Sequence, residues 1–337
     1  MDTISGFWAG ALAISARVDV HDLAAHAGGW EALMACTVDD FVALGVDEKR
    51  ARRWRDTPPL QTQFRALTAL HPHYPAALHR GPSSPPVLFV QGALDALSGP
   101  GVAVVGTRRC TPYGASVARH LGAALAGAGF TVVSGLARGI DSHAHRGGIR
   151  RTVAVMGHGL ATTSPASSAP LRAKILDHGG AIVSAFPDAL PPAQWTFPRR
   201  NSWIVLLSER VVVIQAPDRS GALITAHLAN QLGRDVHAVP GALGVWASRG
   251  SNRLLRDGVH PLLDVDEFVS DLSGTVPAGD ATERWRALLW SGAPLAEVAQ
   301  ERGCSILEML DEVTRMELAG EVVLLPGARY APTRSEH

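Results

Sequence analysis

One segment, residues 101–141, constrains the fold of this chain more than any other. Within it, an apolar run at 102–105 predicts a buried parallel strand, residues 113–127 predict a helix, and a second apolar run at 130–133 predicts another strand. The two runs are followed by small or hydroxyl residues, beginning with Gly106 and Ser134. Backbone amides at such positions can meet an anion, so this βαβ unit predicts a binding site at the carboxyl edge of a sheet.

The same alternation continues along the chain. After an edge strand predicted at 87–90, strands are expected at 152–156, 181–184, 210–215 and 235–239, and helices at 140–149, 170–178, 199–207 and 220–232. Strands that alternate with helices favour a doubly wound parallel sheet, whose right-handed crossovers place the loops after the strands along one edge. We therefore predict an α/β, Rossmann-like domain over residues 58–270, entered through a proline-rich connector at 56–86.

Two smaller domains are predicted at the ends of the chain. The pattern of residues 1–57 predicts short helices, which suits a SAM-like or helix-hairpin-helix module that either binds DNA or only packs against its neighbour. A linker at 271–279 precedes a compact unit at 280–332, with helices at 283–290, 294–302 and 305–319 and then a hairpin. Three helices followed by a hairpin are typical of a winged helix. Its third helix is acidic and would repel a phosphate backbone, so a protein contact is favoured over DNA recognition.

Charge is distributed unevenly along the chain. Arg plus Lys and Asp plus Glu number 31 each overall, but residues 101–263 contain 17 Arg and Lys against 7 Asp and Glu. Sixteen of those 17 are arginine, whose guanidinium makes forked contacts with phosphate, so an anionic partner is expected. The three cysteines are far apart, which indicates neither a disulfide framework nor a zinc site. With no long apolar run and no signal pattern, we expect a cytoplasmic protein without a membrane contact.

Four clusters of hydroxyl residues, glycine and arginine follow predicted strands. They are Thr107-Arg108-Arg109, Ser134-Gly135, Arg199-Arg200-Asn201 and Ser220-Gly221. Together on one edge of a basic domain, they predict a row of pockets for successive phosphates. A dinucleotide site is disfavoured because GxGxxG is missing after the first strand, and a Walker A loop is missing as well.

Catalytic and metal-binding interpretations are disfavoured. His143 and His145 would point about 200° apart on a helix, so they cannot converge with Asp141 on one ion. Ser134 and Ser220 lack the GxSxG elbow expected of a nucleophile. We therefore expect no metal, no cofactor and no catalytic residue.

Eight ordered motifs resemble the DNA processing protein A (DprA) family, also called Smf. They are HYPAAL at 73–78, PPVLFVQG at 85–92, VAVVGTRRCTPYG at 102–114, VVSGLARGIDSHAH at 132–145, FPRRN at 197–201, SGALITAHLA at 220–229, VPG at 239–241 and SRGSNRLLRDG at 248–258. The resemblance covers about residues 60–262, and the C-terminal unit resembles the winged-helix domain that many members append.

The resemblance implies a Rossmann-like domain that binds single-stranded DNA, forms a homodimer and helps to load the RecA recombinase in natural transformation and recombination. Carried onto this sequence, the implied phosphate pocket consists of Gly106, Thr107, Arg108, Ser134, Gly135, Gly139, Phe197, Arg200, Asn201, Ser220, Gly221 and Thr225. Arg109 and Arg199 join this set from the strand-end clusters. Phe197 offers a stacking face for a base. Asp141 is expected to cap the helix that follows it or to orient Arg108.

The sequence departs from the family pattern mainly at carboxylates. Ala185 stands where a glutamate is common, Gln215 stands where an acidic residue is common, and residues 157–170 lack the usual aspartate. These departures indicate a divergent member with an altered pocket. Two alternatives stay open: a LOG-type nucleoside monophosphate phosphoribohydrolase on the same fold, although its PGGxGTxxE loop is missing here, and a nucleotide-sensing module that has lost DNA binding.

Overall fold

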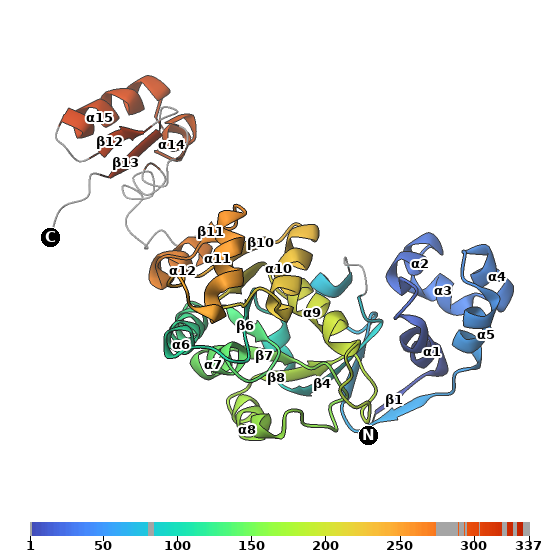
Figure 1. Ribbon diagram of the computed structural model, residues 1–337. Coiled ribbons are helices and arrows are strands. Elements are labelled where there is room, and N and C mark those ends of the chain that lie inside the picture. The colour runs from blue at the N-terminus through green and yellow to red at the C-terminus, as the bar shows by residue number, and fades with distance from the viewer. Residues whose placement is uncertain are drawn as a thin grey trace. The chain divides into compact units, whose positions relative to one another are not determined.

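The computed structural model describes residues 2–79, 84–273, 289, 293, 295–302, 304–318, 322–325 and 329–332. The chain forms two compact units, Met1–Val265 and Asp266–His337, and each has a hydrophobic core of its own (Figure 1). Within the described ranges, none of the helices has the length and apolar character needed to cross a bilayer.

The first unit is built on a nine-stranded sheet. Its strands are β3 (Arg65–Thr68), β4 (Val87–Gly92), β5 (Gly101–Val105), β6 (Thr131–Ser134), β7 (Thr152–Val155), β8 (Ala181–Ser184), β9 (Arg210–Val213), β10 (Asp235–Ala238) and β11 (His260–Pro261), in the spatial order β11-β10-β9-β5-β6-β7-β8-β4-β3. The strands from β11 to β8 run parallel, whereas β4 pairs antiparallel with β8 and with β3. The winding reverses at β5, which lies between β6 and β9. The carboxyl ends of β5 and β9 therefore flank the crevice where open α/β sheets bind ligands.

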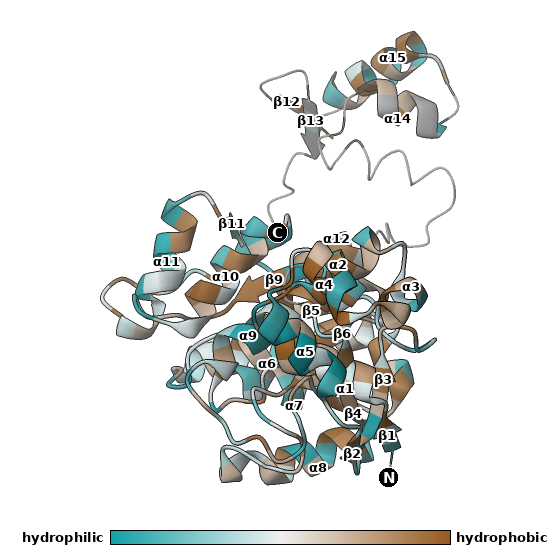
Figure 2. Ribbon diagram, turned by 90° about the vertical axis from the view of Figure 1, so that its right-hand side faces the viewer, coloured by the Kyte–Doolittle hydropathy of each residue, from teal (hydrophilic) through white to brown (hydrophobic). Residues whose placement is uncertain are grey.

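Helices cover this sheet in two groups. α6 (Pro112–Gly127) packs on α7 (Ile140–Gly147), and α9 (Thr196–Leu206) packs on α10 (Gly221–Gln231). α8 (Ala169–Asp177) and α11 (Arg249–Arg256) complete the layers (Figure 1). Short 3-10 helices lie in the connections: η1 (Ala76–His79), η2 (Leu94–Leu97), η3 (Ala166–Ser168) and η4 (Trp246–Ser248). The central strands are apolar and buried, as parallel strands covered on both faces require, and β9 is accordingly brown in Figure 2.

The sequence predicted this α/β alternation correctly, with element ends shifted by up to three residues. The predicted edge strand at 87–90 was wrong in its position, because β3 pairs outside β4 with Leu67 opposite Leu88. Both β3 and β2 (Leu60–Thr62) lie in the predicted proline-rich connector. These strands are too short to show a periodic apolar pattern, and β3 is stabilised by its pairing with β4.

The N-terminal module consists of β1 (Asp2–Ile4), α1 (Gly6–Ile14), α2 (Val20–His26), α3 (Trp30–Ala35), α4 (Val38–Ala43) and α5 (Glu48–Asp56). Its core contains Trp54, whose ring stacks on Phe41 at 4.4 Å and whose indole N–H donates to the carbonyl of Phe7. β1 pairs antiparallel with β2, and Trp8 of α1 belongs to the hydrophobic core of the sheet domain. The contacts of β1 and Trp8 attach α1 to the sheet domain, and α5 packs against α1.

The second unit contains α12 (Val265–Ser273), which begins at the unit boundary, and then α14 (Leu295–Arg302), α15 (Ile306–Leu318), β12 (Val322–Leu325) and β13 (Arg329–Pro332). β12 and β13 pair antiparallel. Ser305 and Glu308 cap the start of α15 with reciprocal hydrogen bonds. The helix predicted at 283–290 lies outside the described residues, apart from Leu289 in the core. The linker predicted from residue 271 was wrong at its start, because residues 271–273 end α12.

Candidate functional site

A cavity of about 330 Å³ lies at the carboxyl ends of β5 and β9, where the winding of the sheet reverses. Five segments surround it: the loop after β5, the connection from β6 into α7, the start of α9, the connection from β9 into α10, and η4. Its lining includes Gly106, Thr107, Arg108, Arg109, Ala137, Asp141, Phe197, Arg200, Asn201, Pro217, Arg219, Ser220, Gly221, Thr225 and Trp246. The fold therefore brings together residues more than a hundred positions apart.

Backbone hydrogen bonds hold the loop after β5 against its two neighbours. The amide of Thr107 donates to the carbonyl of Gln215 at 2.7 Å, and the amide of Ile140 donates to the carbonyl of Thr107 at 3.2 Å. Gly139 precedes Ile140 with φ +81°, and a Cβ there would lie 2.3 Å from the Thr107 carbonyl oxygen. Only glycine allows this close approach, so the loop after β5 is fixed before any ligand arrives.

Gln215 connects three segments beneath the cavity. Its buried side chain accepts from the amide of Thr111 at 3.0 Å and donates to the hydroxyls of Thr111 at 3.0 Å and Ser248 at 3.1 Å. A carboxylate could accept these hydrogen bonds but could not donate any. The neutral amide of Gln215 therefore both accepts and donates, and it joins the end of β9 to the start of α6 and to η4.

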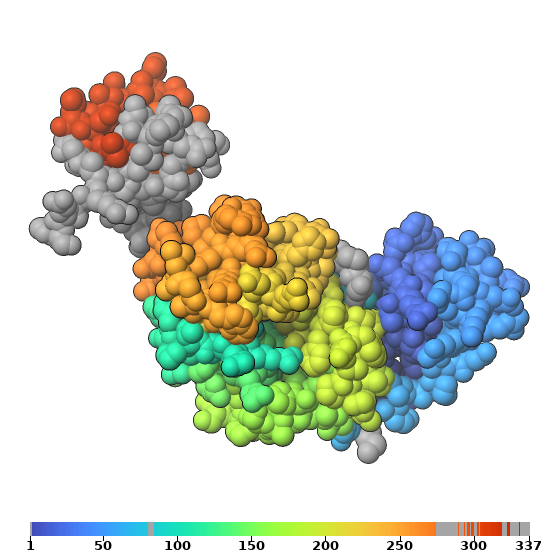
Figure 3. Space-filling model, in the orientation of Figure 1, coloured from blue at the N-terminus to red at the C-terminus, as the bar shows by residue number. Residues whose placement is uncertain are grey.

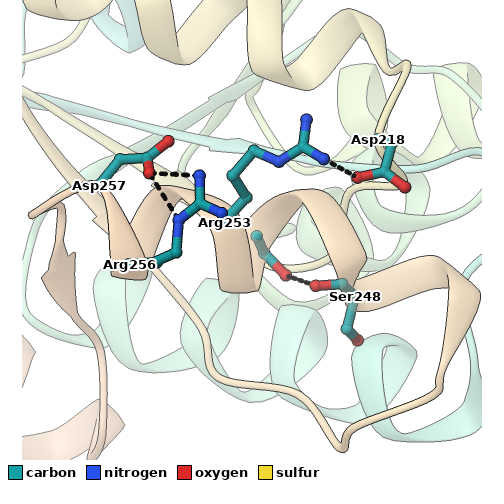
Figure 4. Close-up of polar contacts among 6 residues, drawn as sticks. Asp218, Ser248, Arg253, Arg256 and Asp257 are labelled. Atoms are coloured by element: carbon teal, nitrogen blue, oxygen red, sulfur yellow. Dashed lines mark hydrogen bonds and ion pairs between the residues drawn. The ribbon is translucent and has the colours of Figure 1, made fainter.

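Ion pairs hold α11 next to the cavity. Arg253 pairs with Asp218 at 2.9 Å, which joins α11 to the connection between β9 and α10 (Figure 4). Arg256 pairs with the adjacent Asp257 at 2.8 Å (Figure 4), and both side chains are exposed. These two arginines of the SRGSNRLLRDG motif therefore have carboxylate partners at the protein surface.

Arg200 lies at the bottom of the cavity and is only 6% exposed. One guanidinium nitrogen, Nη1, donates to the carbonyls of Gly135 at 2.8 Å and Val155 at 2.6 Å. Its Nε atom is buried without a hydrogen-bond partner in the described part of the chain. A Cβ on Gly135 would lie 1.9 Å from Nη1, so glycine is required for this packing. The protein thus fixes a buried cation and leaves one of its donors unused.

Asp141 is the carboxylate nearest to this cation. Its Oδ2 accepts from the amide of Gly135 at 3.2 Å, and burial raises its pKa, an effect opposed by Arg200 and by backbone hydrogen bonds. The expectation that Asp141 caps a helix was wrong, because it lies inside α7, whose N-cap is Gly139. The Asp141 carboxylate, in the first turn of α7, instead accepts a hydrogen bond from the Gly135 amide. This hydrogen bond holds the loop after β6 beside Arg200.

Two aromatic rings accompany the arginines. The guanidinium carbons of Arg108 and Arg200 lie 5.4 Å and 6.0 Å from the centroid of the half-buried Phe197 ring. Trp246 is 52% exposed and lies 6.0 Å from the guanidinium carbon of Arg109. A smaller cavity of about 120 Å³ adjoins the first and shares Arg108, Phe197 and Arg200 with it. The site therefore offers cations and aromatic faces together.

A family model described as DNA recombination-mediator protein A matches residues 65–273, which contain every residue of this cavity. The chain belongs to this family. Protein Smf of Escherichia coli is 36% identical over 285 residues, which cover 78% of this chain and 76% of that protein. DNA processing protein DprA of Bacillus subtilis is 36% identical over 203 residues, covering 59% of this chain and 68% of that protein.

Two solved structures of the family resemble the fold. DNA processing protein A from Streptococcus pneumoniae superimposes with a TM-score of 0.69 at 28% identity, over 80% of this chain and 98% of that one. DNA processing protein A from Helicobacter pylori, which is described by its single-stranded DNA binding mode, gives a TM-score of 0.57 at 28% identity, over 63% of this chain and 96% of that one. The resemblance to the DNA processing protein A family is thereby confirmed.

Most of the residues predicted from the family motifs line the two cavities. The larger cavity takes Gly106, Thr107, Arg108, Arg109, Phe197, Arg200, Asn201, Ser220, Gly221 and Thr225, and the smaller one adds Gly135. Three predicted residues line neither. The buried hydroxyl of Ser134 donates to the carbonyl of Val104 at 2.6 Å, Gly139 supports the loop from behind, and Arg199 donates to the hydroxyl of Ser15 in the N-terminal module at 3.3 Å.

Arg219 and Trp246 are lining residues that the sequence patterns did not predict. Arg219 directly precedes the Ser220-Gly221 cluster, so the presence of a further arginine beside a hydroxyl-glycine pair was the available signal. Trp246 belongs to η4, between two family motifs, and no periodic pattern marks it. The available signal was its place in a loop, because binding residues often lie in the loops of an α/β fold.

The two histidines of α7 have separate structural contacts. Thr152 donates its hydroxyl to the carbonyl of Val132, so it accepts from Nδ1 of His145 at 2.7 Å. Nε2 of His145 then accepts from the amide of Leu136 at 3.3 Å, and burial lowers the pKa of this histidine to about 3. Nδ1 of His143 instead faces the Arg119 guanidinium at 3.1 Å. His145 is therefore a neutral residue that supports the loop after β6.

Proposed function

We propose that this chain binds single-stranded DNA in the cavity at the switch point and acts as a recombination mediator. The observation that carries the proposal is the Phe197 ring close to two arginines, Arg108 and Arg200, in a cavity whose loops are fixed by backbone hydrogen bonds. The family description as a recombination-mediator protein and the single-stranded DNA binding mode of the Helicobacter pylori relative support it.

The chemistry of the cavity suits an unpaired strand. The guanidinium groups of Arg108, Arg109 and Arg219 line the cavity as donors for phosphate oxygens, and the amides at the start of α10 add the favourable end of a helix dipole. A base that is not paired can lay its face on an aromatic ring, whereas a base in a duplex is already stacked on both sides. We therefore expect the cavity to prefer single strands over duplexes.

A binding role, not catalysis, is proposed for the same residues. A phosphoribohydrolase needs a carboxylate free to act on the ribose. Among the described residues that line the larger cavity, Asp141 supplies the carboxylate. It is buried and already accepts a hydrogen bond from the Gly135 amide. Incubation with AMP and related nucleotides is expected to release no free base. Release of base by the wild-type chain and not by an Asp141→Asn variant would replace the binding role with a catalytic one.

Three finer statements belong to the same proposal. We propose that the chain transfers single strands to the RecA recombinase, that it forms a homodimer, and that it works in the cytoplasm without a cofactor. The C-terminal unit is proposed to be a winged helix, supported by α14, α15 and the β12-β13 hairpin. RecA filament formation on strands first coated by this chain tests the transfer, and sedimentation equilibrium tests the dimer.

Fluorescence anisotropy with labelled oligonucleotides tests the central proposal. We expect single strands to bind more tightly than a duplex of the same sequence. Arg108→Ala should weaken binding of the single strand, whereas the matched control Arg256→Ala should not, because Arg256 pairs with Asp257 away from the cavity. Equal losses of affinity in the two variants, or equal affinity for the duplex, would contradict the assignment of the cavity.

A further inference from the structure

A separate cavity, of about 490 Å³, is lined entirely by residues of the N-terminal module. It runs between the carboxyl end of α1 and the face of α5, and its lining consists of Ala13, Ile14, Ala16, Arg17, Asp47, Lys49, Arg50 and Arg53. We call this feature the α1-α5 groove. Half of the lining side chains are cations. Packing of the module against the sheet domain does not require cations in this groove, so they call for another explanation.

The cations of the groove are mostly unpaired. Arg50 forms an ion pair with Asp47. Arg17, Lys49 and Arg53 are exposed, and within the described ranges none of their side chains makes an ion pair or hydrogen bond. Like charges gathered in one groove repel each other, so they destabilise the free protein slightly and attract a polyanion. The same helix does pair Arg52 with Glu48 at 2.6 Å outside the groove, so unpaired cations are a property of this face and not of α5 in general.

Helix geometry explains why the cations line one wall. Lys49 and Arg53 are four residues apart on α5, so their side chains lie one turn apart on the same face. Ala51 and Trp54 occupy the opposite face and are buried in the core of the module. The hydrophilic face of α5 is drawn in teal in Figure 2. Burial of Ala51 and Trp54 in the core of the module thus turns Lys49 and Arg53 toward the groove, where they form a basic wall.

Arg199 connects this groove with the cavity at the switch point. It lies next to Arg200 on α9, but its guanidinium donates to the hydroxyl of Ser15 at 3.3 Å. Ser15 stands between Ile14 and Ala16, which line the groove. The N-terminal module (blue) accordingly lies beside the yellow segment that contains α9 in Figure 3. The contact of Arg199 with Ser15 therefore joins α9, which also carries Arg200, to the segment that lines one end of the groove.

We propose that the α1-α5 groove holds the sugar-phosphate backbone of the same single strand, as a continuation of the site at the switch point. The inference rests on the proposed function, because it assigns a second contact to the strand bound there. Charge complementarity identifies the occupant as a nucleic-acid backbone. Among the described residues, no aromatic ring lines the groove, so this contact is electrostatic and independent of base sequence.

Two oligomer lengths and a charge-reversal variant of the full chain test this proposal. A ~6-nucleotide thymidine oligomer fills only the cavity, whereas a ~25-nucleotide oligomer also reaches the groove. The double variant Arg17→Glu, Arg53→Glu is expected to bind the long oligomer about 10-fold to 100-fold more weakly and to bind the short one normally. The matched control, Arg52→Glu, changes the same helix outside the groove and should leave both affinities unchanged.

A milder variant measures the interaction without charge reversal. Arg17→Ala, Arg53→Ala should lower the log-salt slope for the long oligomer by about 1.4, because each arginine that neutralises a phosphate contributes roughly 0.7 to that slope. Unchanged binding of the long oligomer, or an equal loss of affinity for both lengths, would overturn the groove assignment. Binding of an acidic polypeptide with normal DNA affinity would likewise replace DNA as the occupant. Failure of the wild-type chain to bind even the short oligomer would instead reject the proposed function itself.

Discussion

The cavity at the switch point and the α1-α5 groove both present arginine, but they hold it in different ways. In the cavity, Arg200 is buried and donates to two carbonyls, with loops on either side fixed by glycine and by backbone hydrogen bonds. In the groove, Arg17 in the turn after α1 and Arg53 on α5 are exposed side chains. The cavity is therefore organised before a ligand arrives, whereas the groove must order its side chains on binding.

This difference predicts a division of labour along one strand. The cavity adds Phe197 and Trp246 to its cations, so it can distinguish an unpaired base from a paired one. The groove offers charge without aromatic rings among its described lining residues, so it adds affinity that falls steeply with salt and carries no preference for base. Variants in the two regions should consequently differ in stability, in pH dependence and in salt dependence.

The largest difference is expected in folding stability. Arg200→Ala should lower the free energy of unfolding by about 3 to 5 kcal/mol, because it leaves the carbonyls of Gly135 and Val155 and the Asp141 carboxylate without their cation. Arg53→Ala should leave the denaturation midpoint unchanged, since that side chain is exposed. Denaturant titrations compare the two, and equal midpoints would show that Arg200 is not held as tightly as its contacts imply.

Acid should loosen the cavity and spare the groove. The pKa of His145 is lowered to about 3, below its ordinary value of 6.5, so its contribution to stability is present above pH 6.5 and is lost as the pH falls toward 3. Each pH unit in that range costs up to about 1.4 kcal/mol, because the protonated ring cannot accept from the Leu136 amide.

The variant His145→Gln isolates this group from the other titrating residues. Between pH 6.5 and 4.5, the wild-type chain should lose roughly 2 kcal/mol more unfolding free energy than the variant. Urea titrations at several pH values measure the difference. Parallel pH profiles for the two chains would mean that His145 does not support the loop after β6 in its neutral form.

Base stacking should separate the two regions by a smaller amount. Phe197→Ala should weaken single-strand binding by ~1 to 3 kcal/mol if a base stacks on the ring, while Phe197→Trp should retain most of the affinity. Replacements in the groove should not respond to base identity at all. An unchanged affinity for Phe197→Ala would assign that ring to packing alone.

The smallest effect is expected in the salt dependence of single arginines. Arg108→Ala should lower the log-salt slope by roughly 0.7 for short and long oligomers alike, since the cavity takes part in both complexes. Arg53→Ala should lower it by a similar amount for long oligomers only. Anisotropy titrations at several salt concentrations distinguish the two patterns. If Arg108→Ala lowered the log-salt slope for long oligomers only, Arg108 would behave as a groove residue and the assignment of the cavity would be contradicted.

The central fold could be predicted from the sequence because its signals are local and repeated. Long helices and buried four-residue or five-residue strands such as β5 and β6 alternate, and the glycine and hydroxyl clusters between them mark the carboxyl edge. The position of β4 could not be predicted in this way. Its antiparallel pairing with β3 depends on a short strand that has no periodic pattern of its own.

The pocket could be predicted as a set of motifs but not as a geometry. Arg199 and Arg200 are adjacent in sequence, yet successive residues of a helix point about 100° apart, so one faces the N-terminal module and the other the cavity. Asp141 shows a similar limit, because it was expected to cap the following helix or to orient Arg108, whereas it accepts from an amide of the preceding loop. Tertiary contacts decide such roles, and a linear pattern does not contain them.

Photo-crosslinking with a 5-iodouracil oligonucleotide tests the central claim most directly, because the adduct identifies the residue that lies against the base. Digestion and mass spectrometry should find adducts on Phe197, with Trp246 as a second position, and excess unlabelled single strand should abolish them. Efficient crosslinks confined to residues outside the cavity, with Phe197 unmodified, would contradict the assignment of this site to an unpaired strand.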